Sequence, residues 1–179
     1  ETHVSDTETE IRFELRSRQP NRLLCSLKKF QWLPACVAVQ GNVLEFQGEP
    51  THRELLQIAV LLARYPQLSV KNAAAAKNPA EALVIPQAQR RHAFKNIVCG
   101  RKPSQALKFL DQVGLLETFL PEVTAGRHLT QNRFHAHDIF DHLLHSIDGA
   151  YDLNEPVRWS ALLHDVGKVP TRVEGSNGE

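Results

Sequence analysis

The first third of the chain alternates between apolar and polar positions, as short strands do. From Glu10 to Leu15 every second residue is apolar, which predicts a strand. Two further alternating segments, Cys36–Gln40 and Val43–Gln47, flank the dipeptide Gly41-Asn42. Both of these turn residues tolerate positive φ, so the pattern is typical of a tight β-hairpin. Leu68–Val70 is predicted to form a last strand.

Two helical patterns separate these strands. Asn21–Phe30 carries apolar residues at helical spacing, and Thr51 with Glu54 forms a capping-box pattern that opens a helix running to Tyr65. The order strand, helix, strand, strand, helix, strand predicts an α+β domain of the ferredoxin-like type, a split βαβ arrangement, over residues 1–70. Many binding domains share this architecture, so it says little about function.

After a predicted linker over residues 71–85, the periodicity becomes helical. Glycines at 100 and 114 lie where helices are expected to stop. The predicted helices are Gln87–Val98, Ser104–Val113, Leu115–Leu120, Asp138–Gly149 and Val157–Val166.

Charge is distributed unevenly although the net charge is only +1. Residues 1–110 have a balance of +7 and residues 111–179 a balance of −6. Residues 82–110 contain no acidic residue, and such a stretch is able to neutralise a phosphate backbone. The simpler interpretation is a solvated basic face balanced by the acidic half.

The composition excludes some classes of protein. No apolar run approaches the roughly 18 residues of a membrane-spanning helix, and we expect no membrane partner. The 3 cysteines are widely spaced, which argues against a disulfide scaffold or a zinc knuckle and fits a cytoplasmic protein. Oligomeric state is not readable from this pattern.

Residues suited to metal chemistry lie at the end of the last predicted helix. His164 and Asp165 follow its apolar face, and His142 lies beside the apolar stripe of the preceding helix. Imidazole nitrogens with a carboxylate suit a divalent metal ion, and Mg, Mn, Zn, Ni, Co and Fe are not distinguished at this stage. The alternatives are a histidine packed between helices for His142 and a helix-capping role for His164, with Asp165 as a surface charge.

The segment Leu162–Lys168 reads LLHDVGK and resembles the core motif of the HD superfamily of metal-dependent phosphohydrolases, with His142 at the place of that family's first histidine. The preceding sequence is similar to the neck and body of bacterial tRNA nucleotidyltransferases and poly(A) polymerases. This similarity covers roughly residues 86–172, and the segments that carry it are Lys102–Leu107, Val113–Leu116, Leu120–Glu122, Asn132–His135, Asp138–His142 and Arg158–Leu163.

The resemblance implies an all-α neck/body segment and HD-type domain over residues 86–179. The family's nucleotide-adding head, with its Gly-Ser loop and Asp-x-Asp pair, has no counterpart in this sequence, so nucleotide addition is not predicted. The family's HD site uses one more aspartate and its domain has more helices. We expect both beyond Glu179, so the HD domain is predicted to be partial.

Together these patterns predict a divalent-metal phosphohydrolase of the HD type that acts on a nucleotide or a phosphodiester in tRNA or nucleotide metabolism. His142, His164 and Asp165 would hold the metal, and Asp165 and Lys168 would act in catalysis. The alternative is an RNA-binding module with a structural or degenerate HD site. The residues expected to contact phosphate or RNA are Arg133, His135, Arg90, Arg91, Lys95, Arg101 and Lys102, each of which has a loop, capping or solvated role as its simpler interpretation.

Overall fold

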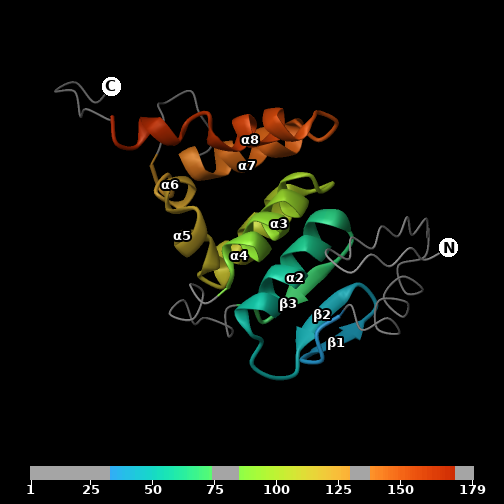
Figure 1. The fold of residues 1–179 in the computed structure, drawn as a ribbon. Helices are drawn as coiled ribbons and strands as arrows, with labels where there is room; N and C mark the ends of the chain where they lie inside the picture. The colour runs from blue at the N-terminus through green and yellow to red at the C-terminus, as the bar shows by residue number, and fades with distance from the viewer. Residues whose placement is uncertain (1–32, 74–84, 130–137, 172–179) are drawn as a thin grey trace.

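The computed structural model describes residues 33–73, 85–129 and 138–171 (Figure 1). A small β-sheet comes first in this part of the chain. Strand β1 (Val37–Gln40) pairs antiparallel with β2 (Val43–Phe46), with Val37 opposite Phe46. Gly41 turns the chain between them at a φ of 60°, which glycine adopts without strain. The predicted hairpin is therefore confirmed. The strand predicted at 10–15 and the helix predicted at 21–30 lie outside the described residues.

Helix α2 (His52–Arg64) returns the chain to the sheet. Thr51 and Glu54 form the predicted capping box, with Thr51 Oγ1 accepting from the Glu54 amide and the Glu54 carboxylate accepting from the Thr51 amide at 2.8 Å. Strand β3 (Ser69–Lys71) then pairs parallel with β2.

This pairing differs from the expected ferredoxin-like order. A split βαβ arrangement has another strand between its two parallel strands, whereas β2 and β3 are direct neighbours in the order β1-β2-β3. The contact begins at the hairpin turn, where the Ser69 amide donates to the Asn42 carbonyl at 2.9 Å, and it places Val70 beside the buried Leu44. The described chain is thus mixed α and β and mostly helical, with one three-stranded sheet.

The helical pattern of the second half is confirmed with small shifts at the ends. Helix α3 occupies the predicted range, and α8 begins before the predicted Val157 because Asn154 caps it, with Oδ1 accepting from the Val157 amide at 3.2 Å. The elements are α3 (Gln87–Val98), α4 (Pro103–Gln112), α5 (Leu115–Phe119), α6 (Pro121–Thr124), α7 (Ile139–Gly149), α8 (Glu155–Leu163) and the 3-10 turn η3 (Val166–Lys168).

The elements stack in layers from the sheet, through α2, to α3 and α4, and then to α7 and α8 (Figure 1). A single hydrophobic cluster extends through these layers from Leu33 to Leu162. The two parts that the sequence divides near residue 70 therefore share one core. Helix α2 approaches the turn between α3 and α4 so closely that a Cβ at Gly100 would lie 2.6 Å from Ala63 Cβ. Only glycine fits this contact.

Candidate metal centre

Helix α7 presents His142 at the edge of its buried face. Leu143 and Ile147 on this helix are fully buried, which fixes how the helix is rotated against its neighbours. Asp138 starts the helix by accepting from the Asp141 amide at 2.7 Å with Oδ1 and from the His128 amide at 2.8 Å with Oδ2. The side chain of His142 keeps 32% of its surface exposed. His142 is thus held on a packed helix but faces outward.

Helix α8 delivers the other two side chains at its C-terminal end. The helix ends at Leu163, His164 is its C-cap, and Asp165 starts the turn η3. Figure 1 shows α7 and α8 side by side. The pairing of these two helices brings together residues that are 22 positions apart in the sequence.

The three side chains converge on one small volume. Nε2 of His142 lies 3.0 Å from Nε2 of His164. Oδ2 of Asp165 lies 3.3 Å from the first of these nitrogens and 3.4 Å from the second. Among the residues that the structure describes, this trio is the group of histidine, cysteine and carboxylate side chains that is close enough to bind one metal ion.

These separations match the edges of a metal coordination shell. Zinc–ligand bonds of roughly 2.0–2.1 Å in a tetrahedral site separate neighbouring ligand atoms by roughly 3.3–3.4 Å. The His-His and His-Asp distances of 3.0 Å, 3.3 Å and 3.4 Å fall in this range or slightly below it. The donor set of two imidazoles and a carboxylate suits borderline divalent ions. The residues therefore fit a metal, and the exposed side of the site leaves room for further ligands.

A backbone contact orients the His164 ring. Its Nδ1 lies 2.9 Å from the carbonyl oxygen of Ala161. A carbonyl only accepts, so Nδ1 is the donor of this bond, and in the neutral ring the lone pair is then on Nε2, toward the site. Metal-binding histidines are commonly fixed in this way by a hydrogen bond from the other ring nitrogen.

Lys168 lies against the acidic member of the trio. Its Nζ donates to Asp165 Oδ2 at 2.7 Å from the end of η3. Burial raises the pKa of Asp165, but the hydrogen bond from Lys168 and the electrostatic effect of His164, Lys168 and His142 outweigh burial and lower the pKa overall. Asp165 is therefore ionised at neutral pH, as a metal ligand must be.

The described residues among those predicted to contact phosphate or RNA lie on α3 or between α3 and α4, outside the trio. Arg133 and His135 lie outside the described residues. Arg91 and Arg101 are exposed, Lys95 pairs with Glu155 at 3.2 Å, and the Arg90 guanidinium stacks 5.6 Å from the centre of the Phe119 ring.

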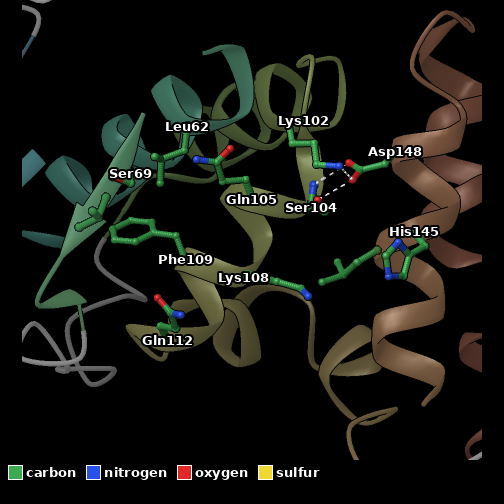
Figure 2. Close-up of a pocket in the computed structure, with 12 residues that line it drawn as sticks. Leu62, Ser69, Lys102, Ser104, Gln105, Lys108, Phe109, Gln112, His145 and Asp148 are labelled. Atoms are coloured by element: carbon green, nitrogen blue, oxygen red, sulfur yellow. Dashed lines mark hydrogen bonds and ion pairs between the residues drawn. The ribbon is translucent and has the colours of Figure 1, made fainter. Parts of the chain in front are cut away.

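The remaining member of that set, Lys102, lines a groove of about 470 Å³ that runs over α4 between β3 and α7 (Figure 2). Its Nζ pairs with Asp148 Oδ2 at 2.7 Å, and Lys108 in the same groove pairs with Asp141 at 2.9 Å. Asp148 also accepts from the Ser104 amide at 3.0 Å and from its hydroxyl at 2.6 Å, which caps the start of α4 from across the groove. The groove lysines thus join α4 to α7.

Sequence reasoning assigned no role to Arg158, which is 6% exposed. Its Nη1 donates to the carbonyls of Val98 and Gly100 at 2.9 Å and 2.8 Å, and its Nε donates to Leu153 at 3.0 Å. The signal was present in the spacing, because Arg158 precedes the buried Leu162 by one helical turn and so lies on the core face. It fixes α8, and with it the His164-Asp165 pair, to the end of α3.

Other chemistry is not indicated in the described chain. Burial raises the pKa of the Cys36 and Cys99 thiols, so neither is an activated thiolate. Within residues 33–73, 85–129 and 138–171, no helix has the length and apolar character needed to cross a membrane.

Comparison with known proteins gives one informative similarity. A stretch of 66 residues is 41% identical to an A-adding tRNA nucleotidyltransferase from Deinococcus radiodurans. The matched stretch covers 35% of this chain and 15% of that protein. No family model matches the chain, and no solved structure matches it. The similarity therefore links part of this chain to a part of a tRNA nucleotidyltransferase.

Proposed function

We propose that this protein is a divalent-metal phosphohydrolase of the HD type that cleaves a nucleotide or a phosphodiester in tRNA metabolism. The observation that carries the proposal is the convergence of His142, His164 and Asp165, whose ligand atoms are separated by 3.0–3.4 Å. The sequence around them resembles the HD motif, and the relative's tRNA substrate class suggests the metabolic context.

Each residue has a definite part in this proposal. A bound divalent ion supplies Lewis-acid polarisation of a phosphoryl group and lowers the pKa of water. His142 and His164 supply neutral nitrogen ligands, and Asp165 supplies the negative charge that favours a cation. Lys168, whose ammonium group already lies in the site, is placed to stabilise negative charge that develops on phosphoryl oxygens.

Metal removal tests this function. We expect the chelated and dialysed protein to lose hydrolysis of bis(p-nitrophenyl) phosphate and of nucleoside phosphates, because the protein side chains alone offer no strong Lewis acid. Readdition of Mn²⁺, Co²⁺, Ni²⁺ or Zn²⁺ is expected to restore it. Activity that persists in chelator after dialysis, or that no divalent ion restores, would contradict the proposal.

RNA binding is a second candidate function, which the exposure of Arg91 on α3 and of Arg101 just after α3 favours. Reversing both charges to glutamate is expected to weaken tRNA binding. The slope of the logarithm of the binding constant against the logarithm of the salt concentration should become less steep by roughly 0.7–0.9 for every phosphate that is no longer neutralised. The control is Lys71→Glu, at an exposed lysine of β3. Equal salt slopes for the double variant and the control would rule out this surface.

A further inference from the structure

One oxygen of the Asp165 carboxylate contacts both the Lys168 ammonium group and the two imidazole rings. Oδ2 accepts from Lys168 Nζ at 2.7 Å, and the same atom lies 3.3 Å and 3.4 Å from Nε2 of His142 and His164. A divalent ion bound among the three side chains would therefore take Oδ2 as its carboxylate ligand. Lys168 and the ion would compete for the same atom.

The two cations would also repel each other. Both would be bonded to the same oxygen, so the two positive charges would lie close together. Asp165 has only 12% of its side chain exposed, so solvent screens this contact weakly. Lys168 has 51% of its side chain exposed and a flexible stem, so its ammonium group is able to swing away from the carboxylate.

We propose that Lys168 is the counter-cation of Asp165 that a divalent metal ion displaces, and that it sets the metal affinity of the site. The inference rests on the proposed function only in that the trio binds a metal. Displacement would couple metal binding to the release of Lys168. The ammonium group would become available to phosphoryl oxygens only after the metal has taken its place at Asp165.

Metal affinity measured without any substrate tests the exchange. The protein is freed of metal by chelation and dialysis and then titrated with Co²⁺, followed by its visible absorption and by calorimetry. Lys168→Met is expected to bind Co²⁺ about tenfold more tightly than the unmodified protein, because a competing positive charge is removed. Lys168→Arg keeps the positive charge, so this variant is expected to bind Co²⁺ about as weakly as the unmodified protein.

A lysine far from the site provides the matched control. Lys71 on β3 forms an ion pair of similar length, 2.9 Å to Glu45, so Lys71→Met removes the same charge elsewhere and is expected to leave Co²⁺ affinity unchanged. Lys168→Gln repeats the test with a polar side chain, and thermal melting of each variant verifies folding.

The outcomes separate this inference from the proposed function. Weaker Co²⁺ binding by Lys168→Met and Lys168→Gln would show that Lys168 positions Asp165 as a ligand, and equal binding would show that Lys168 does not affect metal affinity. Either result, with binding by the unmodified protein intact, would overturn the exchange and leave the metal site standing. Absence of Co²⁺ binding in the unmodified protein and in both variants would overturn the exchange and the proposed metal site together.

Discussion

His164→Ala is expected to abolish metal-dependent hydrolysis while leaving the fold intact. The substitution removes the Nε2 atom that lies 3.0 Å from His142 and 3.4 Å from Asp165, so only two protein ligands remain. Loss of a residue that merely supports a ligand typically costs roughly 10–100-fold in metal affinity or activity, and loss of the ligand itself should exceed this. Metal affinity and the rate of phosphodiester hydrolysis are the two measurements.

The effect on stability should be small. His164 follows the end of α8, its side chain is 41% exposed, and its backbone contact is one hydrogen bond to Ala161. Removal of such a bond costs roughly 0.5–1.5 kcal/mol. His145→Ala, at an exposed histidine one turn beyond His142 on α7, is the matched control and should hydrolyse like the unmodified protein. A His164→Ala variant that keeps metal-dependent hydrolysis would rule out the proposed site.

Arg158→Met is expected to destabilise the fold strongly. Three carbonyl oxygens, those of Leu153, Val98 and Gly100, are deprived of their donor from this side chain. A buried acceptor without a partner costs roughly 1–3 kcal/mol, and part of this is offset because an arginine no longer has to be buried. The net loss of stability should be about 2–4 kcal/mol.

The destabilisation has an additional electrostatic part. Val98 is the last residue of α3, and a positive charge at a helix C-terminus is favourable. The guanidinium also lies 5.4 Å from the centre of the Tyr151 ring. Because α8 carries His164 and Asp165, a looser joint between α3 and α8 should also weaken metal binding.

Urea unfolding provides the measurement, with a lower midpoint at an unchanged slope as the expected result. Arg53→Met is the control, since Arg53 donates twice to Gln89 at an exposed position and surface interactions of this kind contribute little. If Arg158→Met and the control unfold at the same urea concentration, water must satisfy the three carbonyls. The contact of Arg158 with the end of α3 would then not explain the position of α8.

Local chemistry made the secondary structure readable from the sequence. Gly41-Asn42 determines the hairpin because the turn needs positive φ, and Thr51 with Glu54 begins α2 because their side chains satisfy its first amides. Helix α3 occupies the predicted range, and its C-cap residue is Cys99. These features depend on neighbours a few residues away, which sequence patterns report directly.

The tertiary structure decided what depends on distant neighbours. The sequence predicted a split sheet, but β3 pairs directly with β2, because strand order depends on packing between elements rather than on the strands themselves. The ion pair of Lys102 with Asp148 on another helix also depends on packing, and an RNA contact of Lys102 stays a prediction. Burial of Arg158 likewise required the end of α3 to be in place.

Some features of the candidate site follow from the sequence, and others follow from the tertiary structure. Residue types and spacing in the sequence indicated which side chains suit a metal ion, since His142 and the His164-Asp165 pair stand out by both. Only the packing of α7 against α8 decided that Nε2 of His142 lies 3.0 Å from His164 Nε2 and 3.3 Å from Asp165 Oδ2. Lys168 reaches the same Asp165 oxygen locally, from three residues further along the chain. The type of a residue determines which ions its side chain is able to bind. The contact between the two helices determines whether other ligands lie close enough to bind the same ion.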